Sequence, residues 1–421
     1  MDRPSSTCLL TAMYDGLFYT KGSEEFNDWK MSAINPTVIK ELEEFVTEQL
    51  KDCGPATYVD RAEGSYNMIF RFRFTTGTNV ALCIPKPGHT PSALAAEKIA
   101  NEVAWMRYLK AKTSLPVPNL GDFYIQLNRL PFEKIGSITE DPLSGQWKIT
   151  QHPLTMDMHQ LVLGVPAYPT EEWPTRPLQR SSDYFDFVVA QQHNQLWKLR
   201  NLNADQHDEQ DVDLEQAAKI ARLRFKARLG FKQLIPLFHN QSDDSGPFLP
   251  FNPDLDSRNM VIDPNTNRIT GIFDLEFSNA MPTQFARDPP LWLHRVLPGQ
   301  CLEKDFFPWF LQSYQPYLDQ FLDAMKRVEA RSQARDGEKP LSTLMLESWT
   351  SKRCWLNYAA HHADHSDALY WAELRQLHPS GDGPELSPDM ESEMESYVEH
   401  TKKQIAAYEK AWVAEETVST A

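Results

Sequence analysis

The segment LPFNPDLDSRNMVIDPNTNRITGIFDLEFSN, residues 249–279, combines two short apolar runs with a set of acidic and amide side chains. The runs NMVID and RITGIFD flank the turn-forming residues 264–267, which predicts a β-hairpin. The midpoint between Asn259 and Asp274 falls inside that turn, so we expect them opposite each other at the open end of the hairpin. Asp254 precedes Asn259 by five residues, in a loop that begins with NPD.

These three side chains suit a metal-phosphate site. Mg²⁺ binds few carboxylates together with amide or carbonyl oxygens, and phosphate oxygens complete its coordination. Phosphoryl transfer also needs an Asp that orients the attacking hydroxyl. Asp254 therefore fits a catalytic base, and Asn259 and Asp274 fit two metal ligands. Taken singly, each is also an ordinary turn or strand-capping residue, so the prediction rests on their combination.

The amino-terminal part predicts a small mixed α/β unit. Residues 65–75 alternate in the manner of a strand, TTGTN reads as a turn, and VALCIP reads as a second strand that stops at Pro85. Residues 91–112 have the spacing of a helix, with apolar residues at every third or fourth position. These positions are Ala95, Ile99, Val103, Met106 and Leu109.

The rest of the chain reads as mainly helical, apart from the hairpin. Helical spacing recurs over 37–52, 181–200, 211–239, 304–333 and 341–376, and a terminal helix ends near Glu415. We therefore expect an N-terminal helical extension (1–53), a small N-lobe (54–120), a helical C-lobe with the hairpin (121–376), and a linker with a C-terminal helix (377–421).

Charge and composition restrict the partners. A net charge of −16 disfavours nucleic acid, whose phosphates call for basic surface, but it is compatible with a small anionic ligand bound by a few local Lys or Arg side chains. No apolar run approaches the ~20 residues of a membrane helix, and the N-terminus lacks a signal-like pattern, so we expect a cytoplasmic protein. The five cysteines show neither a disulfide framework nor a C-x-x-C metal pattern. The oligomeric state is not indicated.

The hairpin segment resembles the catalytic segment of the aminoglycoside-phosphotransferase-like or choline-kinase-like enzymes, and more narrowly that of the fungal phosphotransferase-family proteins. The motifs IGSI, GPF, ARDPPLWL and SWTS extend the resemblance over most of residues 55–375. It implies an α+β, protein-kinase-like bilobal fold with a small mixed N-lobe and a larger, mainly helical C-lobe. By this resemblance Asp254 would be the catalytic base, Asn259 and Asp274 would bind Mg²⁺, and Glu276 would lie beside them.

The resemblance also assigns a nucleotide side to the site. The stretch EGSYNMIF, residues 63–70, is similar to the loop that covers the ATP phosphates, which makes Gly64, Ser65 and Asn67 candidate nucleotide-binding residues. With one glycine, the same stretch is compatible with a plain turn. Glu102 matches the helix glutamate that pairs with a strand cation in the family, although an i,i+4 surface pair with Lys98 is the alternative.

The sequence departs from the family pattern at three places. Asn252 replaces the usual His before the catalytic base, and it retains the ability to hydrogen-bond the backbone. Cys83 occupies the position of the strand cation, so Lys86 is either its substitute or an ordinary loop lysine. The chain also passes almost directly from Pro118 to the IGSI motif, so the adenine-binding hinge is truncated or absent. A real deletion and a faulty gene model are both compatible with that gap.

Two further segments have open interpretations. His361 and His365 are spaced i,i+4, as for a metal site on a helix, but no third distant ligand accompanies them, and a polar helix face is the alternative. The tail MESEMESYVEHTKKQIAAYEKAW reads as a solvated helix or as a helix that docks a partner.

The resemblance as a whole implies an ATP- and Mg²⁺-dependent kinase that transfers the γ-phosphate to a hydroxyl of a small metabolite, with fungal specialised metabolism as the expected setting. The acidic chain points weakly to a cationic or neutral acceptor. Cys83 and the short hinge motivate an alternative, a degenerate kinase fold that serves as a binding or scaffold protein. A kinase fold repurposed for another biosynthetic step is a third hypothesis.

Overall fold

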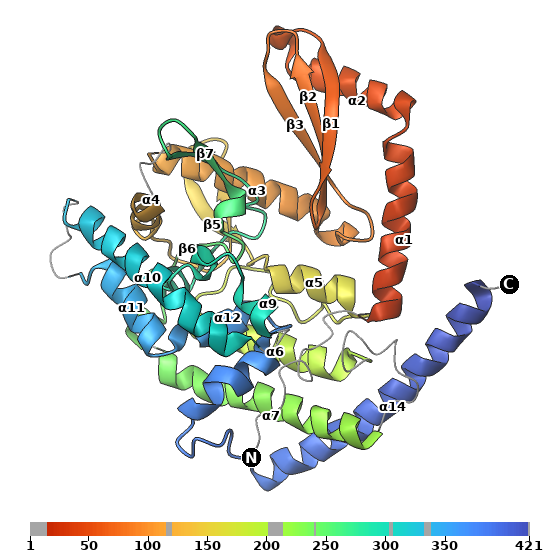
Figure 1. The fold of residues 1–421 in the computed structure, drawn as a ribbon, viewed down its shortest axis with the longest axis vertical. Helices are drawn as coiled ribbons and strands as arrows, with labels where there is room; N and C mark the ends of the chain where they lie inside the picture. The colour runs from red at the N-terminus through yellow and green to blue at the C-terminus, as the bar shows by residue number, and fades with distance from the viewer. Residues whose placement is uncertain are drawn as a thin grey trace.

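The computed structural model describes residues 15–114, 120–200, 214–239, 241–302, 306–331 and 338–419. In chain order the strands are β1 (Ala56–Glu63), β2 (Asn67–Phe74), β3 (Asn79–Pro85), β4 (Ser137–Glu140), β5 (Trp147–Gln151), β6 (Leu249–Phe251), β7 (Met260–Asp263), β8 (Arg268–Ile272) and β9 (Asn279–Met281). The α-helices are α1 (Gly16–Ala33), α2 (Pro36–Gln49), α3 (Ser92–Lys112), α4 (Leu120–Leu127), α5 (Met156–Gly164), α6 (Ser181–Lys198), α7 (Leu214–Phe238), α8 (Thr283–Ala286), α9 (Pro298–Leu302), α10 (Phe307–Glu329), α11 (Leu341–Thr350), α12 (Arg353–His361), α13 (Ser366–Leu369) and α14 (Pro388–Ser419). Small antiparallel sheets combined with many helices are compatible with the expected α+β class (Figure 1).

The sheet β1–β2–β3 stands at one end of the molecule with α1 and α2 beside it (Figure 1). Alternation along β2 buries Met68, Phe70, Phe72 and Phe74 on one face, where they form a core with side chains of α1 and α2. Strands β2 and β3 confirm the two predicted strands. Strand β1 was not predicted, because most of this edge strand is exposed and its sequence lacks apolar alternation.

No strand beyond these three belongs to the sheet in the part of the chain that the structure describes. Helix α3 ends at Lys112 and α4 begins at Leu120, so residues 113–119 alone separate them. Two strands and a linking segment need more residues than this. Strands β4 and β5, which contain the end of the IGSI motif, pair with each other in a separate hairpin. The described residues between α3 and the IGSI motif thus add no strand to the β1–β3 sheet, and the shortened hinge stays a prediction.

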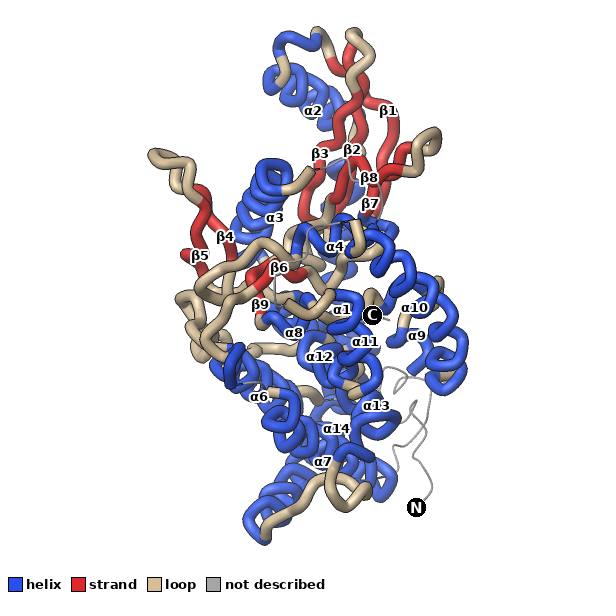
Figure 2. Tube along the Cα trace, turned by 90° about the vertical axis from the view of Figure 1, so that its left-hand side faces the viewer, coloured by secondary structure: helices blue, strands red, loops and turns tan. Residues whose placement is uncertain are grey.

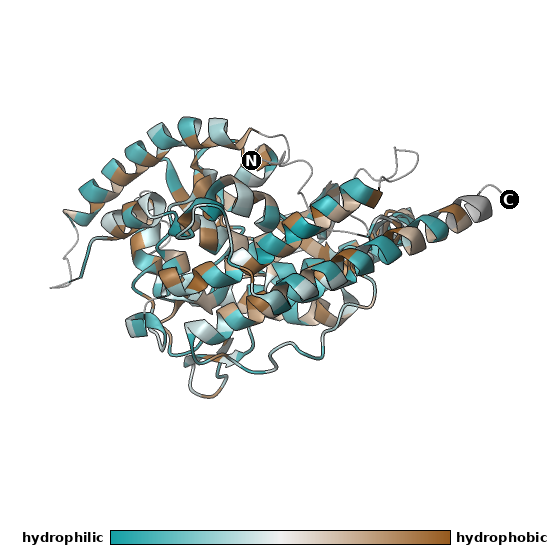
Figure 3. Cartoon of the chain, turned by 90° about the horizontal axis from the view of Figure 1, so that it is seen from below, coloured by the Kyte–Doolittle hydropathy of each residue, from teal (hydrophilic) through white to brown (hydrophobic). Residues whose placement is uncertain are grey.

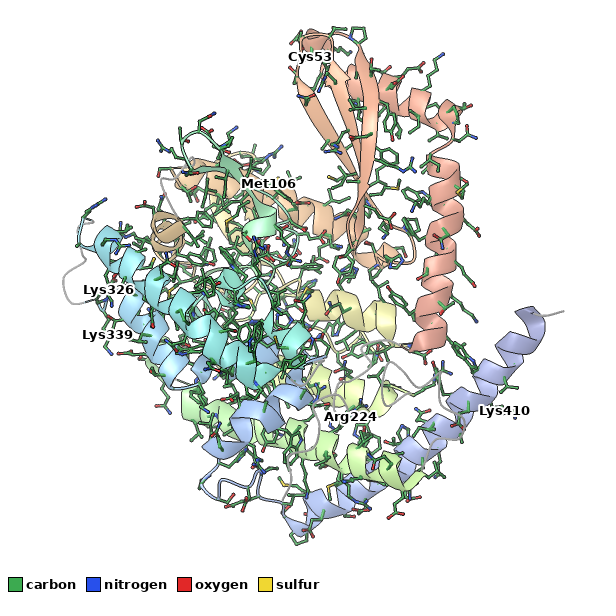
Figure 4. The ribbon with its side chains drawn as sticks, viewed as in Figure 1. Cys53, Met106, Arg224, Lys326, Lys339 and Lys410 are labelled. Carbon is green, nitrogen blue, oxygen red and sulfur yellow. The ribbon has the colours of Figure 1, made fainter. Side chains whose placement is uncertain are left out.

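Helix α3 confirms the predicted helix over 91–112, but its apolar positions are not its buried face. Ile99, Val103 and Met106 are 48%, 41% and 38% exposed, respectively. Met106 lies on α3 in Figure 4. The opposite face, which carries Lys98 and Trp105, is buried against the segment around β9 and against the core. Helical spacing thus identified the element but not the side that packs.

Helix α1 connects the two ends of the molecule. Its N-cap Asp15 bonds the carbonyl of Gly164 at 2.6 Å and the guanidinium of Arg200 at 2.6 Å, both in the helical part. Halfway along the helix, Gly22 lies directly on Gly88 in the loop after β3. A Cβ placed on Gly22 would lie 2.5 Å from the Gly88 carbonyl oxygen, so the two backbones are in contact. Figure 1 shows α1 running from the sheet down to α5.

The large core is built mainly from α6, α7 and α10–α13, and Figure 2 shows these helices gathered at the end away from the β1–β3 sheet. The single helix predicted over 341–376 is divided into α11, α12, α13 and a π-helical turn, Tyr370–Leu374. Lys352, with a φ of 65°, interrupts it between α11 and α12, and His362 ends α12 in a non-helical conformation. The sequence pattern predicted one continuous helix because Lys352 and His362, where the helix is interrupted, are residue types that also occur within helices.

Helix α14 packs on α7 instead of standing in solvent as predicted. Met394, Tyr397 and Val398 are buried against Ala218, Ala221 and Phe225, which α7 supplies. Figure 3 shows the resulting alternation of hydrophobic and hydrophilic residues along the helix that leads to the C-terminus. The packing of α14 was not predicted because its few buried apolar residues are surrounded in the sequence by many charged ones.

Candidate active site

The predicted hairpin forms, with a shift of one residue in its register. Strands β7 and β8 pair antiparallel around residues 264–267, but the register slips between Val261 and Ile262. As a result Asn259 lies opposite Phe273, whose backbone N–H donates to the Asn259 carbonyl at 3.1 Å, and Asp274 follows one residue later. The prediction that Asn259 and Asp274 face each other is wrong by this one position. Asp263 pairs with Arg268 at the turn, which by itself would place Asn259 opposite Ile272, and the extra residue of β8 moves the pairing only as far as Phe273.

A second strand pair holds the loops on either side of the hairpin. Strand β6 pairs with β9, so the segments that follow β6 and precede β9 leave the same ladder. Asn252 bridges these segments with its amide group. Its Oδ1 accepts from the Asp254 N–H at 2.8 Å, and its Nδ2 donates to the Asp274 carbonyl at 3.0 Å. The expectation that Asn252 can hydrogen-bond the backbone in place of a histidine is confirmed.

Asp254 and Asn259 are joined directly. The Nδ2 of Asn259 donates to the Asp254 carbonyl at 2.8 Å and lies 3.4 Å from its Oδ2. The donor half of this amide is thus used within the loop, which leaves Oδ1 as the half suited to a cation. Asp274 adopts a left-handed backbone conformation (φ 61°), unusual for a non-glycine residue. The structure therefore brings Asp254, Asn259 and Asp274 into one hydrogen-bonded unit.

The electrostatics of this unit differ from those of a surface hairpin. Burial, together with the neighbouring Asp274 and Asp256, raises the pKa of Asp254 to about 6. Burial also raises the pKa of Asp274, and the positive charge of Lys98 opposes that change. Asp256 caps the short helix at Ser257–Asn259 and forms an ion pair with Arg258, which neutralises one of the three nearby carboxylates.

Arg258 lies 3.8 Å from Asp254 Oδ1 within the same loop, and a buried cation beside Glu276 comes from α3 and not from β3. Lys98 Nζ lies 3.2 Å from Glu276 Oε2, and both side chains are at most 5% exposed. The interpretation of Lys98 as part of an exposed pair with Glu102 is therefore wrong. On the same helix, Asn101 Nδ2 donates to the carbonyls of Glu276 and Ser278 at 2.9 Å each. Glu102 accepts hydrogen bonds from the backbone of Asp274 and Leu275.

Aromatic side chains surround the Lys98 ammonium. It lies 4.9 Å from the ring centroid of Tyr66 and 5.0 Å from that of Phe277. His159 Nδ1 is 3.4 Å from Nζ, while its Nε2 donates to the His89 carbonyl at 3.1 Å. Burial and the adjacent charge of Lys98 lower the pKa of His159 to about 3, so this ring is neutral and accepts from the lysine.

The loop between β1 and β2 extends toward the same place. The Gly64 N–H bonds the Asn67 carbonyl at 2.9 Å, which closes the turn and leaves Ser65 exposed. Asn67 Nδ2 approaches Glu276 Oε2 at 3.4 Å. Tyr66, which the sequence did not single out, accepts a hydrogen bond from Gln160 through its hydroxyl at 3.1 Å.

Lys86 does not lie beside Asp274 or Glu276. Its Nζ bonds Glu63 at 3.1 Å and the Gly64 carbonyl at 3.2 Å, and it lies 4.0 Å from the ring centroid of Phe26. Lys86 is thus neither a solvated loop residue nor a neighbour of Asp274. Cys83 pairs with Ile69 across the sheet, where Glu102 and Asp274 raise the pKa of its thiol together with partial burial. Sequence spacing did not identify Lys98, because the apolar positions of α3 indicated the opposite face and its partner Glu276 is distant in the sequence.

A cavity of about 190 Å³ adjoins Asp254. Loop residues 250–256 form one wall, and residues 285–292 with α12 form another. Helices α3 and α4 contribute the remainder. Its lining is mainly apolar and aromatic, which is typical of a small-molecule site with a few placed polar groups.

The histidine-rich segment does not form the predicted i,i+4 pair. Helix α12 ends at His361, and His361 packs between Phe251 and Phe285 with ring centroids 4.9 and 5.1 Å away. His362, Asp364 and His365 instead come together, with ligand atoms within 4.8 Å of one another. No pair of cysteines forms a disulfide among the four that the structure describes.

Comparison with known proteins identifies the class. The sequence model of the phosphotransferase enzyme family matches residues 57–285, more than half of the chain, from β1 to α8. The chain belongs to this family. Searches of curated proteins and of solved structures gave no match. The matched range contains every predicted catalytic, nucleotide-binding and metal-binding residue and ends just before the ARDPPLWL segment begins. Within the described residues, no helix has both the length and the apolar character to cross a membrane.

Proposed function

We propose that this protein transfers the γ-phosphoryl group of ATP to a hydroxyl of a small molecule. The proposal rests above all on one observation, the hydrogen-bonded unit of Asp254, Asn259 and Asp274 beside a cavity. Asp254 would accept the hydroxyl proton as the acceptor oxygen bonds to phosphorus and the bond to the ADP oxygen breaks. Family membership supports the reaction class. A cytoplasmic location and a role in specialised metabolism belong to the same hypothesis.

The donor set fits a magnesium ion. Asp274 offers a carboxylate and Asn259 an amide oxygen, and Mg²⁺ combines such ligands with phosphate oxygens. When bound, the ion would neutralise charge on the phosphates. Asn259 would keep its amide orientation because its Nδ2 is fixed by the Asp254 carbonyl. Asn252 would hold both loops at the spacing that the ligands require.

Lys98 would supply the positive charge that Cys83 cannot. It is buried, it is paired with Glu276, and its charge acts on Asp274. Glu102 would then position the backbone of Asp274 instead of pairing with a strand cation. Gly64, Ser65 and Asn67 remain the proposed cover of the phosphates. Lys86 would stabilise that loop from behind through Gly64 and Glu63.

The proposal is tested by Asp254→Asn in the full chain. With Mg-ATP and a panel of alcohols (benzyl alcohol, choline, kanamycin), the wild type should release ADP with at least one of them. Loss of a general base should lower this rate by roughly 10²–10⁴-fold. Asp263→Asn, in the turn of the same hairpin, is the matched control and should retain the rate. Full activity in Asp254→Asn would contradict the assignment.

Nucleotide binding provides a separate measurement. Mg-ATP at 100 times its Kd should add about 2.7 kcal/mol to the free energy of unfolding, and Asp254→Asn should keep this stabilisation because the carboxylate acts on the acceptor. The absence of any Mg-ATP stabilisation in the wild type would contradict an ATP-dependent reaction and favour a non-catalytic binding protein.

A further inference from the structure

The cavity beside Asp254 restricts which hydroxyl compound the site can accept. Its walls are formed largely by apolar and aromatic side chains, among them Phe251, Leu255, Leu291 and Trp292. Since a phosphoryl acceptor must place its hydroxyl at Asp254, the rest of that molecule lies along these walls. The acceptor therefore gains affinity mainly by burying apolar surface.

The volume limits the buried part to about one ring. An apolar cavity of ~150 Å³ in another protein accommodates benzene, and this one measures about 190 Å³. A single six-membered ring with a short hydroxyl-bearing arm fills such a space. A multi-ring amino sugar does not fit inside it.

The charges on the walls disfavour a cationic acceptor. Asp256 is engaged by Arg258, whose guanidinium lines the same cavity. Asp288 is held by Ser348 and by Asn357 Nδ2, the latter at 2.8 Å. Asp254 has to receive the proton of the hydroxyl, and the oxygens of Asp288 already accept hydrogen bonds from neutral groups. Each carboxylate of the described lining is thus engaged before an ammonium group could bind it.

The histidines on the wall add no charge. Burial lowers the pKa values of His361 and His362 to about 3, so both rings are neutral at physiological pH. The acceptor thus contacts neutral imidazoles, aromatic rings and the existing ion pair between Asp256 and Arg258. An uncharged ligand matches this surface best.

Several buried polar atoms on the cavity wall have no hydrogen-bond partner among the described residues, and Trp105 and Ser278 supply two donors of this kind. Trp105 Nε1 belongs to a side chain that is 1% exposed, and Ser278 Oγ to a residue that is 4% exposed. Buried polar atoms are nearly always hydrogen-bonded, so each such exception calls for a ligand or a water. Donors of this kind match an oxygen acceptor, which an ammonium group lacks.

We infer that the acceptor is an uncharged alcohol whose body is a single aromatic or similarly apolar ring carrying an ether or carbonyl oxygen. This inference rests on the proposed phosphoryl transfer for the role of Asp254, but binding of such a compound can be measured without any transfer. Its hydroxyl lies at Asp254, its ring lies against the apolar walls, and its ring oxygen accepts from Trp105 or Ser278.

The test compares benzyl alcohol, its three methoxy isomers, choline and kanamycin as probes. Tryptophan fluorescence and calorimetry on the full chain give their Kd values. We expect saturable binding of the aryl alcohols, and at least one methoxy isomer should bind about fivefold more tightly than benzyl alcohol, because a net hydrogen bond contributes about 1 kcal/mol. Trp105→Phe removes the indole N–H but keeps the ring, and Ser278→Ala removes the hydroxyl. At least one of them should abolish this preference while leaving benzyl alcohol binding within twofold.

The apolar wall is tested with Leu291→Asp. This change should weaken aryl alcohol binding at least tenfold, whereas Leu291→Met should leave it within twofold. Leu143→Asp, at a site that is 97% exposed in the β4–β5 connection, controls for the added charge and should have no effect. Retained Mg-ATP stabilisation in each variant shows that the chain is folded.

The outcomes separate this inference from the proposed function. If choline or kanamycin is phosphorylated more efficiently than every aryl alcohol, the acceptor class is wrong while phosphoryl transfer stands. If the aryl alcohols bind as expected but no probe releases ADP, the acceptor class stands and the proposed function is contradicted. If no methoxy isomer binds better than benzyl alcohol, the assignment of the ring oxygen is wrong.

Discussion

The segment around the hairpin and the β1–β3 sheet approach the site from opposite sides, and they have kept different amounts of the family pattern. The hairpin side holds Asp254, Asn259 and Asp274 through hydrogen bonds within the segment itself. The sheet side has Cys83 in place of a cation and has no further strands among the described residues. In the proposed site, Lys98 of α3 supplies the positive charge that β3 lacks. Oxygen ligands whose positions depend on hydrogen bonds within their own segment cannot be replaced from another element in this way.

The largest effect is expected at Asp274, on the hairpin side. Asp274→Ala should remove most of the Mg²⁺-dependent stabilisation by ATP and lower phosphoryl transfer by at least ~10³-fold, because a bound metal contributes several kcal/mol of transition-state stabilisation. A thermal-shift titration with ATP, with and without Mg²⁺, measures the binding part. An unchanged magnesium dependence would place the metal elsewhere and remove the main contrast between the two sides.

The second prediction compares two lysines. Lys98→Met should lower phosphoryl transfer by ~10²-fold, whereas Lys86→Met should change the rate less than threefold, since it touches the loop but not Asp274. Lys98→Met alone leaves the buried Glu276 without its partner, which costs about 3–5 kcal/mol.

The double variant Lys98→Met/Glu276→Met separates stability from chemistry. It should regain most of the lost stability in urea unfolding because neither charge is then buried alone, but it should stay inactive. If Lys86→Met abolished transfer and the double variant did not, the catalytic cation would be Lys86, on the side of the β1–β3 sheet. The sheet side would then have kept its own cation, contrary to the contrast drawn between the two sides.

The third prediction concerns pH. As the proposed base, Asp254 would act in its deprotonated form, and burial with the neighbouring carboxylates raises its pKa to about 6. The rate should therefore be maximal above pH 7 and should fall about tenfold for each pH unit below 6. Asp256→Asn removes one of the carboxylates that raise this pKa, so its profile should move toward lower pH. A flat profile between pH 5 and 8 would contradict the role of Asp254.

The smallest effect is expected on the outer face of α3. Ile99→Ser or Val103→Ser should cost no more than about 0.5 kcal/mol because both side chains are exposed. Trp105→Ala, one turn away on the buried face, should cost about 3–5 kcal/mol. Urea unfolding of the three variants tests the difference. A large cost at Ile99 would mean that the chain covers this face after all.

The sequence predicted the hairpin side well because its roles depend on short-range features. The turn, the two strands and the spacing of Asp254 and Asn259 are all local, and only the exact register of the two strands was missed. Lys98 was missed because its partner, Glu276, is far along the chain, and a lysine in a charged helix reads as exposed. The apolar periodicity of α3 led to a wrong prediction of its buried face for a related reason. Periodicity within a helix does not show against which face the rest of the chain packs.

The contact between Gly22 and Gly88 has a mechanical consequence. With residues 113–119 as the short connection on one side, α1 is a second link between the sheet and the helical part, 18 residues long and therefore about 27 Å. Any opening that moves Gly64 away from Asp254 must carry α1 along or separate the two glycines. If the proposed nucleotide site is correct, the N-terminal helix would limit how far the sheet can move away from the hairpin to admit the nucleotide.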